Sequence, residues 1–486
     1  MRSVVTGPRE TWPDERAMAR AERGGSFDLL RAERDARAGE LPTAADFHRL
    51  PVEWHKEKAR RLKDEARERG VDGGLFLTNR WNVIYATGLL HTGTERPFAC
   101  FLPLDDDALI WFHPYLDTAL VESWWCTQAY AYFDHHHAQT GWPSRGEVTQ
   151  DGTVDLYRWW GSTLAELGYD GRTIGIDSGS PAELGLLPGW HEQGRLDFFS
   201  VDVPEPTRPE GGPFGRMAAA IPAARFVDCY DILIRHRAVK NEAETRLVQR
   251  SMDVLSEIHA FARDYLLERG PGAIDWEVGN AARLWGMQRL AEQIPHSGLP
   301  HEAAGVDVYL GCRTGPATAY PHPNQLSWTP VERGHALQIA GLVHIGGYGG
   351  EQYRSFLVAP WTDWQERVWE VHTRAYEIQA EESRAGNTCS NVAAAVHRHQ
   401  ADQGCAHLVY HRPGHSQGME GHQPPYHALG DYTVLRPGMH FSNEPGLYDV
   451  EHGFGFNHGN NILVAEGRGL QMGTAPCTKE WCLLEL

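Results

Sequence analysis

The sequence predicts two domains, an α/β domain in its N-terminal part and a larger α+β domain after it. Between residues 54 and 225, short apolar strand-like runs alternate with helical or loop segments, which is typical of an α/β domain. From residue 226 onward, helices and glycine-rich strand segments follow one another in blocks, which indicates an α+β domain. We therefore expect domains at residues 46–225 and 226–486, preceded by a charged N-terminal extension at residues 1–45.

Local patterns predict the elements of the N-terminal part. The charged, amphipathic stretch Trp54–Gly70 ends in a glycine and predicts a surface helix. A short buried strand follows from Gly74, and Asn79 and Asn82 indicate a turn after it. The extension alternates in charge and predicts a solvated arm or helix, or a flexible tail. Further strand-like runs begin at Phe98, Ala108 and Thr173.

Helical patterns dominate the start of the second domain. Apolar residues recur every three to five positions between Leu247 and Tyr265, and the pattern stops at Gly270-Pro271-Gly272. A second helix is expected at about 276–292, and a helix pair at 364–403. Residues 332–356 and the last segments of the chain are strand-like and rich in glycine turns, and these segments carry the polar clusters.

Composition excludes several classes of protein. With 45 basic and 64 acidic residues, the net charge of −19 would repel nucleic acid and anionic lipid. No run of 18 apolar residues predicts a membrane span, and the polar first residues lack the apolar core of a secretory signal. Eight scattered cysteines without a CxxC pair suit a reducing compartment. We expect a cytoplasmic enzyme with a small-molecule substrate and no nucleic-acid or membrane partner.

Histidines and glutamates gather near the C-terminus. His415 and His422 are seven residues apart, which corresponds to two turns of a helix or to opposite faces of a strand, so the spacing alone does not make them co-ligands. Glu444 follows a Pro-Gly turn that resembles a hairpin connection. Upstream, His322 lies between two prolines that stiffen its loop. A rigidly held imidazole can act as an acid, a base or a hydrogen-bond donor near neutral pH.

Taken in order, these motifs resemble the pita-bread superfamily, which includes creatinase, prolidase, aminopeptidase P and methionine aminopeptidase. The motifs are His322-Pro323, Gly347-Tyr348 with Arg354-Ser355-Phe356, Gly414-His415 with His422, Asn443-Glu444-Pro445-Gly446, and Asn461 with the apolar residues after it. The resemblance covers about 228–486, and 54–222 is similar to the smaller N-terminal domain of creatinase and prolidase. It implies an α+β pita-bread C-terminal domain in a homodimer, with each N-terminal domain reaching over the partner's active site.

The resemblance also implies a metal site of five residues, two Asp, one His and two Glu, that holds two divalent ions. The corresponding positions here are Ala340, Glu351, His415, Glu444 and Gly459, so two carboxylates are missing. Two dications would be underneutralised by the two glutamates that remain. We therefore expect no metal cofactor. The alternative is a single ion on Glu351, His415 and Glu444, because three protein ligands plus water form a catalytic arrangement.

Creatinase is the precedent for a metal-free member of the superfamily, and its catalytic histidine corresponds to His322. We accordingly expect a creatinase-like, metal-independent hydrolase that cleaves a C–N bond of a small amino-acid-derived or cationic substrate by histidine acid–base chemistry. The expected catalytic residues are His322, His415, His422, Glu444 and Glu351. The expected substrate-binding residues are Arg354, Tyr348, Tyr353, Arg96 and Trp81.

Three other functions are compatible with the same residues. The first is a metal-dependent Xaa-Pro peptidase, similar to prolidase, with a reduced metal site. The second is a pita-bread lyase acting on a small zwitterion. The third is a pita-bread module that binds peptides or proteins without catalysis, although it would have no need of all three histidines, His322, His415 and His422.

Overall fold

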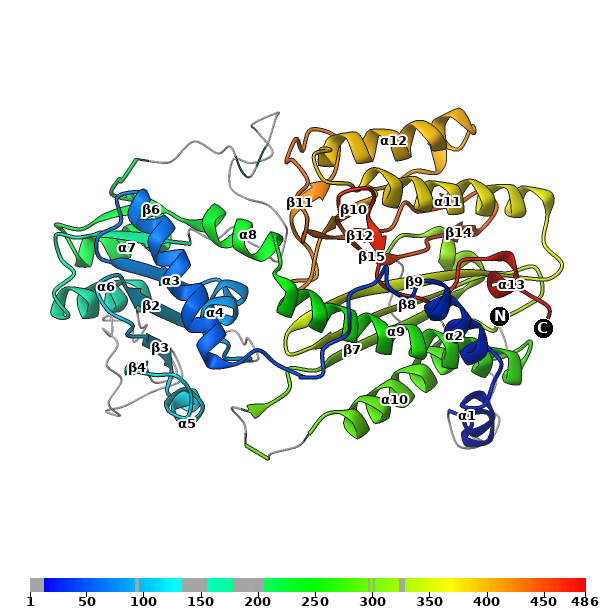
Figure 1. Ribbon diagram of the computed structural model, residues 1–486, viewed down its shortest axis with the longest axis horizontal. Helices are drawn as coiled ribbons and strands as arrows, with labels where there is room; N and C mark the ends of the chain where they lie inside the picture. The colour runs from blue at the N-terminus through cyan, green and yellow to red at the C-terminus, as the bar shows by residue number, and fades with distance from the viewer. Residues whose placement is uncertain are drawn as a thin grey trace, which may run out of the picture. The chain divides into compact units, whose positions relative to one another are not determined.

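In the computed structural model the chain divides into two units (Figure 1). The structure describes residues 13–91, 96–132, 155–177, 197, 199, 205–295, 298–299, 302–322 and 328–486. One unit contains 50–238 and 296–303, and the other contains 1–49, 239–295 and 304–486. The N-terminal unit therefore begins at residue 50 and the C-terminal unit resumes at residue 239, whereas the sequence analysis placed these boundaries at 46 and 226. The segment before residue 50 belongs to the C-terminal unit.

The N-terminal unit is built on a six-stranded mixed sheet in the order β4-β3-β2-β1-β5-β6. Its core is aromatic: the Phe76 ring lies 5.5 Å from Phe112 and 5.4 Å from Trp160, which α6 contributes. The strands are β1 (Gly74–Leu77), β2 (Ala99–Pro103), β3 (Ile110–Pro114), β4 (Gln128–Tyr132), β5 (Thr173–Ile176) and β6 (Arg225–Asp228). The helices are α3 (Val52–Glu68), α4 (Arg80–Thr87), α5 (Thr118–Glu122), α6 (Leu156–Glu166), α7 (Gly212–Ala220) and α8 (Tyr230–Ala238). The predicted α/β domain is confirmed.

Asn79 has a different role from the predicted one. Its side chain accepts hydrogen bonds from the backbone nitrogens of Trp81 and Asn82, at 3.0 and 3.3 Å, and so caps the N-terminus of α4. The prediction of a turn at this point was wrong. Asparagine is favoured both at turns and at helix N-caps, so its presence alone does not distinguish the two.

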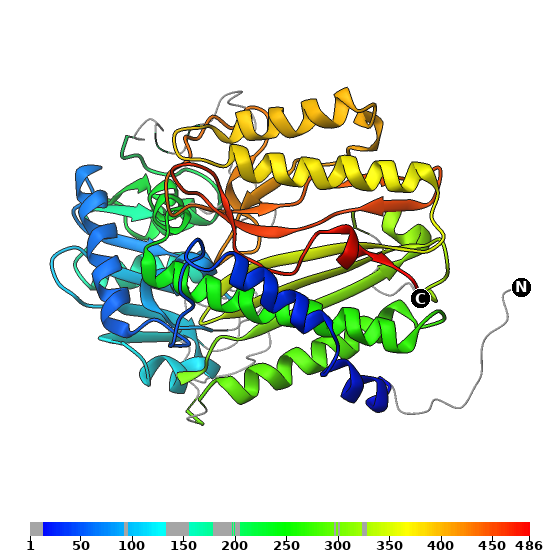
Figure 2. The same ribbon diagram turned by 45° about the vertical axis from the view of Figure 1, so that its right-hand side comes forward.

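In the described residues of the C-terminal unit, two larger sheets lie between two pairs of helices (Figure 2), and β13 and β14 form a third sheet of two strands. Helices α9 and α10 pack on the sheet β17-β9-β8-β7, and α11 and α12 pack against the sheet β11-β10-β12-β15-β16. The two sheets meet where Tyr353 of β9 pairs with Gly459, just before β15. This arrangement is the pita-bread fold that the resemblance implied, and it places residues of β7, β8, β9 and β10, together with the residue after β12, around one site.

The bounds of its elements follow the predicted pattern. The helices are α1 (Glu15–Ala21), α2 (Ser26–Ala36), α9 (Glu242–Arg269), α10 (Asp275–Gln293), α11 (Asp363–Glu382), α12 (Cys389–Asp402) and α13 (Lys479–Cys482). The strands are β7 (Asp307–Thr314), β8 (Ala336–Ile345), β9 (Tyr348–Val358), β10 (Gly414–Ser416), β11 (Gln423–His427), β12 (His440–Asn443), β13 (Leu447–Asp449), β14 (Phe454–Phe456), β15 (Asn460–Leu463), β16 (Leu470–Gln471) and β17 (Leu483–Leu484).

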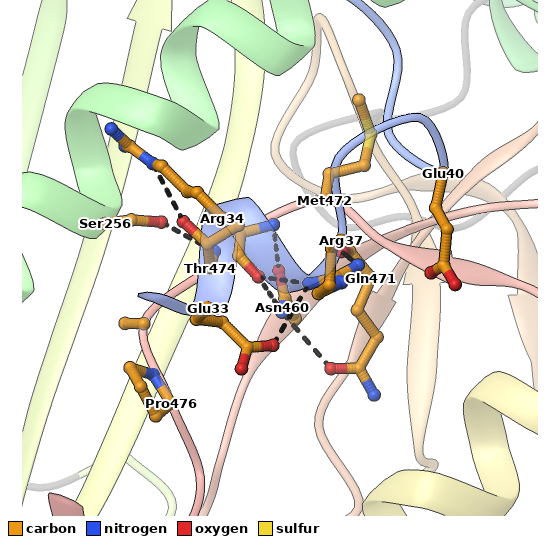
Figure 3. A network of polar contacts seen from close by, with 12 residues as sticks. Glu33, Arg34, Arg37, Glu40, Ser256, Asn460, Gln471, Met472, Thr474 and Pro476 are labelled. Atoms are coloured by element: carbon orange, nitrogen blue, oxygen red, sulfur yellow. Dashed lines mark hydrogen bonds and ion pairs between the residues drawn. The ribbon is translucent and has the colours of Figure 1, made fainter. Parts of the chain in front are cut away.

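Polar contacts attach α2 to the C-terminal unit (Figure 3). Arg34 Nε donates a hydrogen bond to Thr474 Oγ1 at 3.2 Å, and Arg37 donates to the backbone carbonyl of Gln471. The Thr474 backbone nitrogen in turn donates to Ser256 Oγ of α9 at 2.9 Å. Residues 15–36 of the expected extension are therefore helices packed on α9. Across the described residues, no helix is both long and apolar enough to cross a membrane.

Candidate active site

A cavity of about 530 Å³ opens within the C-terminal unit. It collects side chains from both sheets and from the loops that follow them. Its lining residues are Tyr309, Gly311, Cys312, Arg313, Pro321, His322, Gln338, Ala340, Tyr353, His411, Arg412, His415, His422, Glu444, Tyr448 and Asn457. Four of the five predicted catalytic residues line this cavity, and the fifth, Glu351, contacts His415 from behind it.

His415 lies between two carboxylates. Its Nε2 atom is 3.1 Å from Glu351 Oε1 and 2.9 Å from Glu444 Oε1. Glu444 also accepts a hydrogen bond from Ser442 Oγ at 2.9 Å, and Glu351 accepts one from the Tyr353 hydroxyl. One imidazole nitrogen and two carboxylate oxygens therefore converge, all within 4.8 Å of one another.

The orientation of the His415 ring is set by its own backbone neighbour. Nδ1 donates to the carbonyl of Ser416 at 3.2 Å, which directs Nε2 toward Glu351 and Glu444. Burial alone would lower the pKa of His415, but the negative charges of Glu444 and Glu351 outweigh burial and raise its pKa to about 10. In the protein without an ion, Nε2 therefore carries a proton at neutral pH.

The two other predicted histidines lie at the cavity. His422 directly precedes β11, which pairs antiparallel with β10, and its ring centroid is 3.9 Å from that of His415. The positive charge of His415, together with burial, lowers the pKa of His422 to about 4. His322 is exposed on the loop after β7. Its neighbour Pro323, which was expected to stiffen this loop, lies outside the described residues.

Tyr353 fills the space beside the two positions that lack a carboxylate. It is the register partner of Ala340 across β8 and β9, and on its other side it exchanges backbone hydrogen bonds of 3.0 and 2.9 Å with Gly459. A Cβ atom on Gly459 would lie 2.7 Å from Cδ2 of Tyr353. A glutamate at 459 and the tyrosine ring therefore cannot occupy this site together without a shift, and the site does not fit a second ion.

We predict that Gly459→Glu alone destabilises the protein, by about 1–3 kcal/mol, because the new side chain overpacks against Tyr353. The double variant Gly459→Glu/Tyr353→Ala should lose less stability than the sum of the losses in Gly459→Glu and Tyr353→Ala, because removal of the ring makes room for the glutamate. Urea unfolding of the wild type and of the single and double variants measures both effects. Equal stability of the wild type and Gly459→Glu would show that Tyr353 does not block position 459.

One divalent ion, by contrast, fits the residues that remain. Glu351 Oε1 and His415 Nε2 are buried and lack a hydrogen bond of good geometry, although they face each other at ion-pair distance. Two carboxylates and a neutral imidazole would balance the charge of a single dication. The expectation of no metal is therefore not supported by the donor set.

Two of the predicted substrate-binding residues contact the protein itself. Arg354 is buried and donates hydrogen bonds to the backbone carbonyls of Ala475, Pro476, Tyr353 and Gly459. Tyr348 is buried and its hydroxyl donates to Glu244 Oε1 at 3.1 Å. In the structure, both residues therefore hold parts of the protein together. The sequence could not show this, because a short-range pattern does not distinguish a strand residue that faces a cavity from one that faces the core.

Trp81 and Arg96 belong to the N-terminal unit. Trp81 lies in α4 and is partly covered by the guanidinium of Arg80, 4.9 Å from its ring. Arg96 precedes β2 and is partly buried. Their roles in substrate binding stay predictions.

Sequence analysis missed the residues that form the rest of the cavity wall. They include Tyr309 and Arg313 of β7, His411, Tyr448 of β13, and Asn457. The sequence held a signal for three of them: His411 begins the histidine-rich cluster, Tyr448 closely follows Glu444, and Arg313 is a lone basic residue in a segment that ends at Gly315-Pro316.

Comparison with known proteins shows which proteins this chain is similar to. Residues 246–466 match the metallopeptidase family M24. This match spans a little less than half of the chain, and it shows that residues 246–466 are similar to that family. Among curated proteins, it is 29% identical over 218 residues to the probable dipeptidase PepE of Mycobacterium tuberculosis, which is 45% of this chain and 54% of that protein. The chain thus spans about half the length of the curated relatives it matches.

Solved structures share the fold over most of the chain. The dipeptidase PepE from Mycobacterium ulcerans superposes with a TM-score of 0.66 at 20% identity, over 90% of this chain and 100% of that one. A recombinant prolidase from Thermococcus sibiricus also has a TM-score of 0.66, at 18% identity, over 88% and 99%. At these identities the likeness establishes the fold, which confirms the predicted pita-bread class.

Proposed function

We propose that the protein is a peptidase-type hydrolase that cleaves a C–N bond of a small amino-acid-derived substrate, with a site for one divalent ion. The observation that carries this proposal is the convergence of Glu351, His415 and Glu444 at a cavity of substrate size. The relatives described as dipeptidases support peptide-bond hydrolysis, the alternative of the sequence analysis, more than the creatinase-like reaction.

Glu351, His415 and Glu444 would hold the ion. When bound, a divalent ion at such a site lowers the pKa of a coordinated water and polarises a carbonyl group. The protein contributes the positions of the ligands: the Tyr353 hydroxyl holds Glu351, and Ser442 Oγ holds Glu444.

His422 and His322 are the groups placed to handle substrate protons. His422 is exposed to the cavity next to His415, and His322 reaches the same cavity from a different loop. Two imidazoles on separate elements can contact opposite sides of a bound substrate. One can then bind the oxygen of the scissile carbonyl group, and the other can give a proton to the leaving nitrogen.

Metal counting combined with hydrolysis assays tests this proposal. We predict that protein treated with EDTA and then dialysed against Mn²⁺ or Zn²⁺ binds one ion per chain, measured by elemental mass spectrometry. Hydrolysis of a panel of dipeptides should disappear in EDTA and return with the metal.

Each contrary result excludes a different part of the proposal. Two tightly bound ions per chain would contradict the one-ion site. Hydrolysis that persists in EDTA without bound metal would restore the metal-independent reaction that the sequence analysis expected. No hydrolysis of any peptide by the metal-loaded protein would overturn the peptidase assignment.

A further inference from the structure

Arg313 presents a basic group to the cavity, and it forms no ion pair with an acidic side chain in the part of the chain that the structure describes. It lies on β7, and among the described residues no carboxylate oxygen lies within 4 Å of its guanidinium. The titratable groups whose charges act on it are Tyr448, Tyr353, Tyr309 and Cys312, and burial lowers the pKa of its guanidinium. A cation that is partly buried without a counter-ion is costly, unless a ligand supplies the opposite charge.

One edge of the Arg313 guanidinium has no hydrogen-bond acceptor among the described residues. Within the described part of the chain, its guanidinium makes one hydrogen bond, from Nη1 to the carbonyl of Pro321 at 2.9 Å. Nε is buried without a partner. Nε and Nη2 form the edge opposite to that bond, and their parallel N–H groups match the two oxygens of a carboxylate.

The other arginines near the site differ from Arg313. Arg354 is occupied by four backbone carbonyls, as described above. Arg412 is exposed, and its guanidinium stacks 4.2 Å above the ring of Tyr426. Arg313 alone among these three combines partial burial, contact with the cavity and an edge without an acceptor.

The cavity is therefore divided by charge. Tyr353 is near both charges: its hydroxyl donates a hydrogen bond to Glu351, and the positive charge of Arg313 opposes the rise in the pKa of this hydroxyl that burial and Glu351 cause. The charges of Arg313 and Glu444 also act on the pKa of Tyr448, which Arg313 lowers and Glu444 raises. A ligand that spans this cavity would meet the His415 cluster at one end and a cation at the other.

We propose that Arg313 binds a carboxylate of the substrate through its Nε/Nη2 edge, so that the site selects amino-acid-derived molecules with a free carboxylate. The inference rests on the proposed hydrolase function and narrows its substrate class. Arg313 is then a specificity-determining residue, which holds the substrate while the His415 cluster faces the bond to be cleaved.

Matched probes that differ only in this charge test the proposal. The first pair is the dipeptide Ala-Pro and its C-terminal amide, compared by kcat/KM with the metal-loaded protein. The second pair is L-proline and L-prolinamide, compared by isothermal titration calorimetry, which needs no turnover. The proteins are the wild type, Arg313→Gln, Arg313→Lys and Arg398→Gln, the last at an exposed position of α12 as a control for loss of one positive charge.

We expect the wild type to prefer each free carboxylate over its amide by about 10- to 100-fold, the value of a charged hydrogen-bond pair. In Arg313→Gln the preference should fall to less than about threefold, because KM should rise strongly for Ala-Pro and much less for its amide. Arg313→Lys should keep only part of the preference for the free carboxylate, because lysine has the positive charge but lacks the two parallel N–H donors. Arg398→Gln should match the wild type. Thermal unfolding of each variant confirms that it is folded.

The two kinds of probe separate failure of this inference from failure of the proposed function. If no peptide is hydrolysed but proline binds over prolinamide in an Arg313-dependent way, the Arg313 assignment stands and the peptidase assignment falls. If the wild type shows no carboxylate preference in either assay, or Arg313→Gln keeps the preference, the Arg313 assignment is overturned.

Discussion

Replacing Glu444 by glutamine should lower kcat by about 10²–10⁴-fold on any substrate that the protein hydrolyses. The substitution keeps the size and the hydrogen bond from Ser442 Oγ but removes the charge that lies 2.9 Å from His415 Nε2. The site loses one of its two anionic donors, so the affinity for a divalent ion should fall as well. Steady-state kinetics and metal titration of the same preparation measure the two effects.

A control for this prediction is Glu451→Gln. Glu451 is exposed in the loop after β13, so its loss removes one negative charge without touching the cluster. This variant should keep wild-type kcat. If Glu444→Gln retained more than half of the wild-type kcat while remaining folded, Glu444 would have no part in the chemistry, and the reacting groups would have to be sought around His322.

Acidification should unfold the C-terminal unit, with a midpoint between about pH 4 and 5. Buried histidines cause this, because burial lowers the pKa of His259 to about 3 and of His372 to about 4, and lowers those of His440 and His458 well below the usual value. The unfolded chain takes up protons below about pH 6.5, whereas the folded chain does not, so stability falls as the pH drops.

The size of the effect follows from the same pKa values. At pH 5 each such histidine costs about 2 kcal/mol relative to neutral pH, and four together approach the whole stability of a typical domain. Urea unfolding at several pH values measures it. His372→Gln should make the pH dependence shallower by about one proton, while His407→Gln, at an exposed position, should not change it. A free energy of unfolding that stays constant from pH 7 to 5 would refute this account.

Local sequence pattern was sufficient for most elements of the fold. The helix expected from Trp54 is α3, the long periodic run is α9, and the helix pair between 364 and 403 is α11 and α12. These predictions succeed because apolar periodicity and stop signals such as Gly270 act within a few residues. The turn predicted at Asn79 failed because capping and turn formation use the same side-chain chemistry.

The candidate site was predicted only in part. His415, His422, Glu444 and Glu351 do come together, and the motif order of a pita-bread protein was what pointed to them. Arg354 and Tyr348 belong to the same motif but face the protein interior, and Arg313 was missed. A strand residue and its neighbour point to opposite faces of the sheet, so the sequence cannot tell which face borders a cavity until the second sheet is in place.

The sequence by itself determined the fold class and the identity of most elements, and its resemblance to pita-bread proteins implied that two metal-ligand positions, Ala340 and Gly459, lack a carboxylate. Only the tertiary structure showed what occupies the space at these two positions. Tyr353 pairs with both Ala340 and Gly459, which are far apart in the chain, and its ring takes up the space beside them. The physical reason is that a binding site consists of distances between side chains on separate strands, and register and packing set those distances.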